Sequence, residues 1–413
     1  MRVPLIGVTR HGLRVATCEV AGVETVAINL LADTGARYES EALNGVAHLF
    51  EHMVFKGSMR RSAREIAEAI EDVGGQLNAW TSRDMTAFHA RVLARDLPLG
   101  LDLIADMLGD PRFDEEELVR EKHVVLQELG EARDTPDDIV FDHLQEAAFP
   151  GQALGRSILG SEDSLERITA ADLRSWRDSH YQPGQLTLVV AGKAEHDAVM
   201  RLAEAAFVPA GTPGVRAAAE AVRFSAGTAA DHRKAEQAQL TMGLPAPGYH
   251  DATHDAAVLF TMAVGGGMSS RLFQDVREAR GLAYSVSAAV SPYADGGLMS
   301  VHAACAKDQA AAARALIDEV LAGAVQTLST AELERARAQA VAGLLMALES
   351  PTGQADYAAR QLVIHGRFLE PCEVIARLEA VSVDEARAAG AAMLAHAPAR
   401  AEIGAGAKRR KAA

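Results

Sequence analysis

The chain contains little cysteine and few aromatic residues. Its three cysteines, Cys18, Cys305 and Cys372, lie far apart and form no C-x-x-C pair. This pattern is typical of reducing compartments and excludes a thiolate metal site. Aromatic residues make up 5% of the chain, against 49% for all hydrophobic residues. Alanine, valine and leucine must therefore build most of the core, and we expect many alanine-rich helices that pack closely.

Long apolar runs are also missing. No uncharged apolar run reaches the ~18 residues of a membrane span. The nearest, residues 256–268, is short and carries three glycines near its end. Residues 1–7 lack the long apolar core of a signal peptide. We therefore expect a soluble, cytoplasmic protein with no membrane partner.

Positive charge is in deficit. The chain has 41 Lys+Arg and 56 Asp+Glu residues, a formal net charge of −15. A strongly acidic chain is a poor candidate for binding phosphate backbones, so we expect no nucleic-acid partner. The overall field favours basic peptides, although most charge of this kind is solvated surface.

The length and an internal repeat predict two related halves. At about 100–200 residues per domain, 413 residues make two to four folding units. Two stretches share a pattern 215 positions apart, with Leu118 matching Leu333 and Pro136 matching Pro351. Turn-forming residues at 209–214 give the best linker between the halves. We predict two homologous domains, an N-terminal domain over residues 1–210 and a C-terminal domain over residues 222–413.

Each half mixes strands and helices. Apolar, β-branched runs predict strands over residues 25–32, 185–191 and 238–244. Other segments predict helices over residues 62–73, 97–108, 114–132 and 170–180. Strands and helices interleave without strict βαβ alternation, so we expect an α+β fold rather than a doubly wound parallel sheet.

The strongest chemical signal is His48-Leu49-Phe50-Glu51-His52, inside an apolar stretch at 46–55 that predicts a buried helix. At 3.6 residues per turn, His48, Glu51 and His52 share one face. Two imidazoles at i and i+4 can hold one Zn²⁺, and Glu51 can then reach a water on the metal, as in the inverted H-x-x-E-H signature. The alternative is three titratable side chains satisfied near a core, which is costly without a metal or partner.

A catalytic zinc needs a third protein ligand. Glu128 and Glu121 are two helical turns apart in the predicted helix at 114–132 and share a face. We assign Glu128 as the ligand and Glu121 as a residue that orients a ligand, although composition alone does not separate them. Glu116 and Glu117 are weaker rivals near the helix start, where acids often serve the helix dipole.

The repeat gives an internal check on these candidates. Positions 215 residues after Glu128 and Glu121 are Gly343 and Ala336, and the second half has no H-x-x-E-H motif. The candidate ligands are thus absent where the scaffold recurs, so the fold does not require them. This favours a functional role for the first-half set.

With these motifs the sequence resembles the pitrilysin family of zinc metallopeptidases, most closely the short-subunit branch of the mitochondrial processing peptidase and its bacterial relatives. Between His52 and Glu128 lie 75 residues, which fits the third-ligand spacing of that branch. The resemblance rests on residues 44–52, Gly74-Gly75 with 78–82, and the segments 121–128, 265–273 and 277–284.

The resemblance implies two homologous α+β domains, each a mostly antiparallel sheet with helices packed on one side, that face each other across a chamber. It implies one Zn²⁺ per chain and a peptide substrate. Asn78, Ala79, Trp80 and Thr81 match the edge strand that pairs with an extended substrate through main-chain hydrogen bonds. Arg277 and Tyr284 match the second-domain pair that reaches toward the substrate carbonyl.

The same chain carries the zinc set and the Arg277–Tyr284 pair, whereas some relatives divide them between two subunits. We therefore expect a homodimer, with a heterodimer of related subunits as the alternative. Trp80 and Phe88 stand where tyrosine is frequent in the family, and Asp84 where glutamate is frequent. These departures concern subsite preference rather than zinc binding.

Together these observations predict a zinc endopeptidase that hydrolyses short or unfolded peptides, with Glu51 as general base. The alternatives are a non-catalytic structural subunit and a peptide-binding module that keeps zinc for its structure. His89 and His123 lie near the expected site, but lone histidines are usually structural. The basic tail at 408–411 is expected to be solvated.

Overall fold

The computed structural model describes residues 1–209, 211, 214–216 and 218–405. The predicted linker at 209–214 falls partly outside these residues, and the basic tail at 408–411 falls wholly outside them. The chain forms two compact units. Unit 1 comprises Met1–Leu129, Ser157–Glu220 and Leu344–Pro371, and unit 2 comprises Gly130–Arg156, Ala221–Gly343 and Cys372–Ala413.

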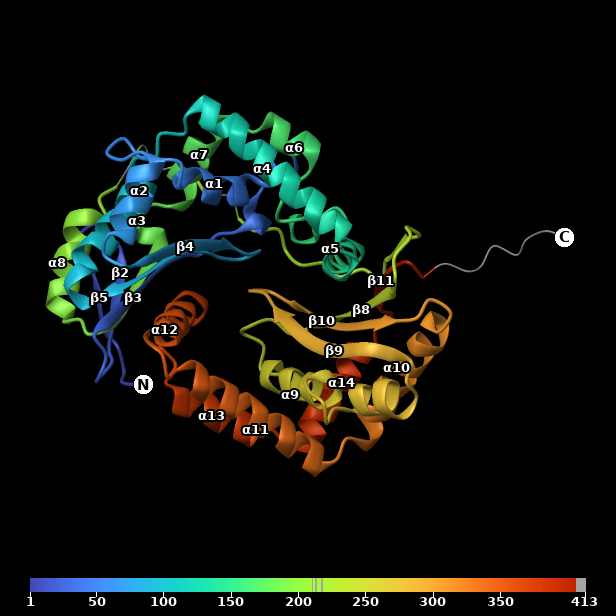
Figure 1. Cartoon of the computed structure of the whole chain (residues 1–413). Coiled ribbons are helices and arrows are strands. Elements are labelled where there is room, and N and C mark those ends of the chain that lie inside the picture. The colour runs from blue at the N-terminus through green and yellow to red at the C-terminus, as the bar shows by residue number, and fades with distance from the viewer. Residues whose placement is uncertain (210, 212–213, 217, 406–413) are drawn as a thin grey trace. The chain divides into compact units, whose positions relative to one another are not determined.

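Unit 1 is built on a six-stranded sheet (Figure 1). The strand order is β1-β2-β6-β3-β5-β4, and every neighbouring pair is antiparallel except β2 with β6. The strands predicted over 25–32 and 185–191 are confirmed as β3 and β6. The bounds are β1 Leu5–Val8, β2 Arg14–Glu19, β3 Thr25–Ala32, β4 Gln76–Thr81, β5 Thr86–Leu93 and β6 Leu186–Gly192.

Helices of unit 1 cover one face of this sheet. Alternate residues of β3 point toward them, so that Val26, Ile28 and Leu30 are fully buried in one core with the apolar sides of these helices. The Ser62 side chain and Glu65 form a capping box that starts α2. The helices are α1 Val46–Val54, α2 Ala63–Glu71, α3 Leu97–Gly109, α6 Glu162–Arg167, α7 Ala170–His180 and α8 His196–Ala206.

Unit 2 repeats this plan with a five-stranded sheet of order β7-β11-β8-β10-β9, antiparallel except for β7 with β11. The strand predicted over 238–244 is confirmed within β8. The strands are β7 Thr228–Asp231, β8 Ala238–Ala246, β9 Ala283–Pro292, β10 Gly297–Cys305 and β11 Ala399–Ile403, and the helices on one face are α9 His254–Gly265, α10 Ala310–Thr327, α13 Pro371–Ala380 and α14 Val383–Leu394. The α+β class predicted from the sequence is confirmed.

Each sheet also carries one helix from the other half of the chain. The long helices α4 (Glu115–Asp134) and α11 (Thr330–Ala347) each begin in one unit and end in the other. After α4, helix α5 (Pro136–Ala148) packs on β8 and β11, and after α11, helix α12 (Pro351–His365) packs on β3 and β6. Figure 1 shows α12 on the face of the unit 1 sheet opposite α3 and α8.

Because of the exchanged helices, the two units are not the contiguous ranges 1–210 and 222–413 predicted above. The reason is burial. In unit 2 the second face of the sheet is apolar and forms a core of its own with α5, in which Val140, Leu144 and Phe149 are buried together with Ala401 and Ile403. A contiguous division would leave this apolar face exposed to water.

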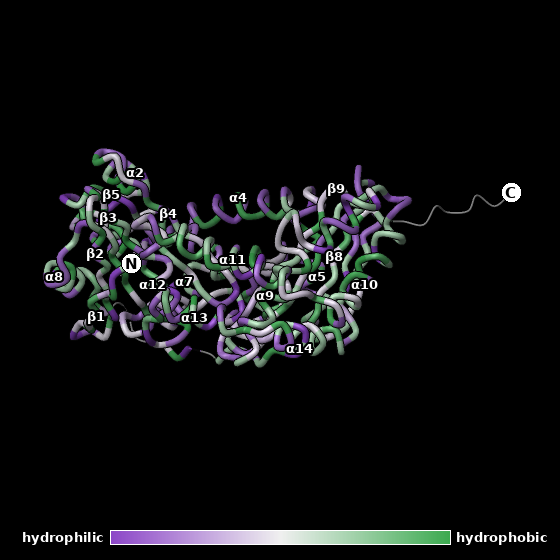
Figure 2. The backbone as a smooth tube through the Cα atoms, turned by 90° about the horizontal axis from the view of Figure 1, so that it is seen from below, coloured by the Kyte–Doolittle hydropathy of each residue, from purple (hydrophilic) through white to green (hydrophobic). Residues whose placement is uncertain are grey.

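The strands of the sheets are more hydrophobic than the long helix α4. Figure 2 shows hydrophobic segments along the strands β2, β3 and β8, whereas α4 alternates between hydrophilic and hydrophobic turns. Among the described helices, none combines the length and the apolar character needed to span a bilayer.

Candidate metal centre

Helix α1 places the three motif side chains on one face. Six of its nine residues are buried against the core, which fixes the rotation of the helix and leaves His48, Glu51 and His52 partly exposed on the remaining face. The helix starts after Gly45, whose φ of 93° lies in the left-handed region. A Cβ at this position would lie 2.9 Å from the Gly160 Cα, so glycine is required both by conformation and by space.

Helix α4 brings a third donor to the two imidazoles. His48 Nε2 and His52 Nε2 lie 3.2 Å apart, and Glu128 Oε2 lies 3.8 Å from the first and 3.7 Å from the second. Ligands at about 2.0–2.2 Å around a tetrahedral zinc are separated by about 3.3–3.6 Å. The donor types and their spacing therefore fit a zinc ion. Among the residues that the structure describes, this is the one cluster of three such side chains.

The two carboxylates of α4, assigned above as a ligand and as an orienting residue, make different contacts in the structure. Glu121 is buried and its Oε1 accepts a hydrogen bond from His52 Nδ1 at 2.9 Å, while its Oε2 contacts Lys56 Nζ at 2.6 Å. Because the carboxylate accepts, Nδ1 of His52 carries the proton and Nε2 keeps its lone pair for a metal. Glu121 thus orients an imidazole and Glu128 stands among the donors. The weaker rivals Glu116 and Glu117 pair instead with Arg120.

Protonation of the two histidines is set by different neighbours. Burial and the adjacent His52 lower the pKa of His48 to about 4, so its ring is neutral near pH 7 as a metal ligand requires. Its Nδ1 is buried without a hydrogen-bond partner. Burial also pulls the pKa of His52 down, but the bond to Glu121 and the charge of Glu128 outweigh it and raise that pKa.

Glu51 lies beside the cluster and contacts the edge of the sheet. Thr81, the last residue of β4, donates a hydrogen bond from Oγ1 to Glu51 Oε2 at 2.5 Å. Burial raises the pKa of Glu51 above its ordinary value, although the bond from Thr81 and the nearby His52 act against this rise. A carboxyl group whose pKa lies closer to neutrality is better suited to accept and return a proton.

The predicted substrate strand is an edge strand of unit 1. Within the described part of the chain, β4 pairs only with β5 and ends the sheet. Leu77 and Ala79 pack against the helix-side core, and Thr81 on the same face contacts Glu51. Asn78 and Trp80 point to the other face. The structure thus brings Ala79 and Thr81 to the side of the metal cluster, whereas pairing with a peptide stays a prediction.

Arg277 and Tyr284 lie in unit 2, and their relation to the metal cluster stays a prediction. Arg277 belongs to a π-helical segment, Phe273–Ala279, and Tyr284 is the second residue of β9. The Arg277 guanidinium lies 5.9 Å from the centroid of the Tyr284 ring. Tyr284 is 73% exposed. The two residues therefore form one group at the surface of unit 2.

The sequence reasoning missed Glu39. This buried carboxylate accepts hydrogen bonds from the main-chain N–H of Gly45 at 2.8 Å and of Ala47 at 2.8 Å, and from Asn44 Nδ2 at 2.9 Å. It caps the first turn of α1, directly before His48. An acidic residue nine positions before the motif gives no local pattern that would reveal this contact.

Two family models together match most of the chain. A family model described as Insulinase (Peptidase family M16) matches residues 14–162, and one described as Peptidase M16 inactive domain matches residues 167–340. An uncharacterized zinc protease of Streptomyces coelicolor is 36% identical over 402 residues, covering 95% of this chain and 88% of the relative. An uncharacterized zinc protease of Bacillus subtilis is 35% identical over 377 residues, with coverage of 91% and 92%.

Solved structures show the same fold at low sequence identity. A crystal structure of a peptidase M16 inactive domain from Pseudomonas fluorescens has a TM-score of 0.91 at 19% identity, covering 98% of this chain and 99% of the other. A protease from Helicobacter pylori has a TM-score of 0.90 at 20% identity, with coverage of 97% and 100%. The chain belongs to peptidase family M16, the pitrilysin family of metallopeptidases.

Proposed function

We propose that this chain is a zinc-dependent endopeptidase that hydrolyses short or unfolded peptides, with one Zn²⁺ per chain held by His48, His52 and Glu128. One observation carries the proposal. Three donor atoms converge beside a carboxyl group, Glu51, that is itself hydrogen-bonded to the last residue of an edge strand. The names of the Streptomyces and Bacillus relatives support it at the level of a zinc protease.

Zinc, when bound, supplies Lewis acidity, which acidifies water and polarises a carbonyl oxygen. Glu51 acts as the general base: one carboxylate oxygen takes the proton of the attacking water and then returns it to the amine that leaves when the peptide bond breaks. Thr81 holds Glu51 Oε2 through its hydroxyl, so the direction of the carboxylate is fixed before substrate arrives.

Glu121 and Lys56 hold the donor His52 in position without being donors themselves. The bond from His52 Nδ1 to Glu121 fixes the tautomer and the ring orientation of His52, and Lys56 compensates the second oxygen of that buried carboxylate. These neighbours lower the pKa of Glu121, against the effect of its burial. Glu121 therefore stays ionised and keeps accepting from His52.

The substrate binds as an added strand on β4. Main-chain groups at the free side of Asn78, Ala79, Trp80 and Thr81 pair with an extended peptide, which makes recognition tolerant of sequence and excludes chains that are already folded. Arg277 and Tyr284 stabilise the negative charge that develops on the carbonyl oxygen of the substrate. Their surface position on unit 2 and their mutual contact support a joint role.

Two measurements test this function. A zinc-specific chelator should abolish cleavage of a fluorogenic peptide library, and added zinc should restore it. Glu51→Gln should keep zinc but lose more than about a hundredfold in kcat, because general base catalysis contributes 10²–10⁴-fold. Glu115→Gln, at the exposed start of α4, is the matched control. Retained zinc with near-normal cleavage by Glu51→Gln would remove Glu51 from its role.

The non-catalytic alternative makes the opposite forecast. A structural or peptide-binding subunit would bind peptides with and without chelator and would cleave none of them.

We further propose that the protein is a cytoplasmic homodimer, since one chain carries both the metal-site candidates and the Arg277–Tyr284 pair. Light-scattering mass in solution tests the dimer, and a single-chain mass would refute it.

A further inference from the structure

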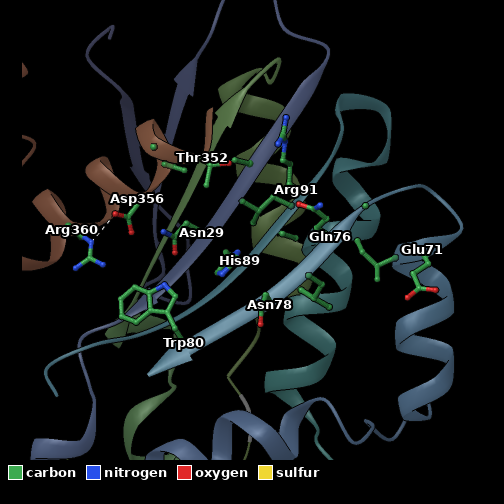
Figure 3. A pocket seen from close by; sticks show the side chains of 18 residues that line it. Asn29, Glu71, Gln76, Asn78, Trp80, His89, Arg91, Thr352, Asp356 and Arg360 are labelled. Atoms are coloured by element: carbon green, nitrogen blue, oxygen red, sulfur yellow. Dashed lines mark hydrogen bonds and ion pairs between the residues drawn. The ribbon is translucent and has the colours of Figure 1, made fainter. Parts of the chain in front are cut away.

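A cavity of about 840 Å³ lies on the face of the unit 1 sheet that carries α12, opposite the face of the metal cluster. Figure 3 shows its floor formed by β3, β5 and β4 and one wall formed by α12. Asn78 and Trp80 line it from the edge strand. The cavity therefore adjoins the strand to which the proposed function assigns the substrate, and the inference below rests on that function.

A row of polar side chains crosses the floor of the cavity. Asn29 on β3 stands directly opposite His89 on β5, and His89 stands directly opposite Asn78 on β4. Directly opposed residues of antiparallel strands share one face, so the three side chains lie side by side (Figure 3). Strands are spaced about 4.8 Å apart, and an added strand on β4 would place its own residue next in this row.

The row has unmet hydrogen-bonding capacity. Asn29 is 5% exposed, and its Oδ1 is buried with no hydrogen-bond partner in the part of the chain that the structure describes. Among the described residues, the His89 side chain has no hydrogen-bond partner, and Asn78 Oδ1 accepts only from the neighbouring N–H of Ala79. Unmet hydrogen-bonding capacity of this kind is costly, so the row favours a ligand that brings polar groups of its own.

The charges around the cavity cancel. Asp356 and Arg360 on α12 form an ion pair at 2.9 Å, and the Arg360 guanidinium lies over the Trp80 ring at 4.9 Å from its centroid. Glu71 and Arg91 at the other end carry opposite charges. Burial lowers the pKa of His89, against the pull of Asp356, so the ring is neutral near pH 7 with one donor and one acceptor.

We infer that this cavity is a substrate subsite for an uncharged side chain that both donates and accepts hydrogen bonds, and that glutamine is its preferred occupant. A carboxamide can both donate a hydrogen bond to, and accept one from, the amide of Asn78 and the neutral ring of His89. Lysine, arginine, aspartate or glutamate would bring a charge next to Asp356 and Arg360, which already pair with each other, and an apolar side chain would leave the row unsatisfied. Glutamine is one methylene longer than asparagine and therefore reaches further along the row.

The inference is tested by binding, so that it does not depend on turnover. The probes are short alanine–serine peptides that carry a single glutamine, whose position is moved along the peptide. Matched peptides carry methionine, glutamate or lysine at the same position instead. The protein is the zinc-loaded Glu51→Gln variant. We expect the glutamine peptide to bind about tenfold more tightly than the methionine peptide, which carries an apolar side chain of equal length. The difference should occur at one position or at alternate positions, because successive side chains of a strand face opposite sides.

Two variants assign the preference to the cavity. Asn29→Leu and His89→Phe replace each polar group by an apolar one of similar size and should reduce the glutamine preference to less than about twofold, with methionine peptides bound as before. His302→Phe is the matched control, because His302 is a half-buried histidine on the unit 2 sheet. Thermal midpoints of all three variants separate a lost preference from a lost fold.

The outcomes are distinct. Equal affinity for glutamine and methionine at every position, or a preference that survives both Asn29→Leu and His89→Phe, overturns the subsite. Tighter binding of lysine or glutamate also overturns it, since a charged occupant contradicts the balance of charges. Failure of the wild-type protein to cleave any peptide, with the glutamine preference intact in the binding assay, refutes the proposed hydrolysis and leaves the subsite standing.

Discussion

Helices α4 and α11 occupy equivalent places in the two halves and differ most where the metal cluster forms. Both cross from one unit to the other, and both are followed by an exchanged helix that begins at a proline, Pro136 or Pro351. The Leu118 and Leu333 side chains are buried alike. Yet α4 buries Glu121 where α11 buries Ala336, and α4 offers Glu128 where α11 has Gly343.

This difference favours the prediction that the carboxylates serve chemistry rather than the fold. A methyl group fills the Ala336 position without any partner, whereas Glu121 needs His52 and Lys56 to offset the loss of water around its charge. A scaffold that tolerates alanine would not retain a buried acid for packing. The two helices therefore give matched pairs of positions for experiment.

The largest effect is expected at the pair Glu128 and Gly343. Glu128→Ala removes a donor from the cluster and should lower zinc content and reduce kcat/KM by more than about a hundredfold. Gly343→Ala, at the equivalent exposed position, should leave both unchanged and slightly raise the thermal midpoint, because alanine favours helix over glycine. Zinc analysis and peptide cleavage on the same samples measure this contrast. Full zinc content in Glu128→Ala would exclude Glu128 as a ligand.

The next effect is on stability, at Ala336. Ala336→Glu places a carboxylate at a buried position that lacks the partners of Glu121 and should cost about 3–5 kcal/mol. A drop in the thermal midpoint measures it. Ala338→Glu, on the exposed side of the same helix, is the control and should change little. Equal midpoints for the two variants would show that α11 tolerates a buried charge, and the argument from Glu121 would fail.

A smaller effect is expected when α4 is made like α11 at position 121. Glu121→Ala frees the His52 ring and should weaken zinc affinity about 10–100-fold while the three donors remain. Competition with a chromogenic zinc chelator measures the affinity. Glu131→Ala, exposed on the same helix, should keep wild-type affinity. Unchanged affinity in Glu121→Ala would mean that packing alone orients the imidazole.

The smallest effect concerns the starts of the two helices. Arg271 donates two hydrogen bonds to Glu332 on α11 and lowers the pKa of that carboxyl to about 2. A depressed pKa stabilises the fold above the ordinary value of 4.5, and this contribution is lost as the pH falls from about 4.5 to 2. Glu332→Gln should therefore lower the thermal midpoint at pH 7 and differ less from wild type at pH 3.5.

The equivalent position on α4 supplies the control. Glu117 pairs with the exposed Arg120, and such surface pairs contribute little to stability. Glu117→Gln should leave the midpoint nearly unchanged at both pH values. A constant difference between Glu332→Gln and wild type across this range would contradict the assignment to the ionised carboxyl.

Local patterns were sufficient for the elements and for the motif. The helix predicted over 46–55 is α1, because an apolar periodicity of 3.6 fixes which residues are buried and hence which face His48, Glu51 and His52 share. The strand over 25–32 is β3 with the predicted bounds. These predictions succeed because each depends on residues within one or two turns of one another.

Contacts between distant segments were beyond such patterns. Glu39 caps α1 through main-chain groups that no side-chain pattern reports. The exchange of α5 and α12 depends on which sheet face is left uncovered, which is a property of whole layers. The row of Asn29, His89 and Asn78 depends on strand register, and a shift of one residue would send these side chains to the other face.

The sequence by itself determined the identity of the two imidazoles and the adjacent acid, because a helix converts their spacing directly into a shared face. Only the tertiary structure decided which carboxylate of α4 stands among the donors and which one orients His52. Both lie on one face of one helix, two turns apart, so their roles differ only through the position of α4 against α1. That position is set by the packing of the core rather than by any local pattern.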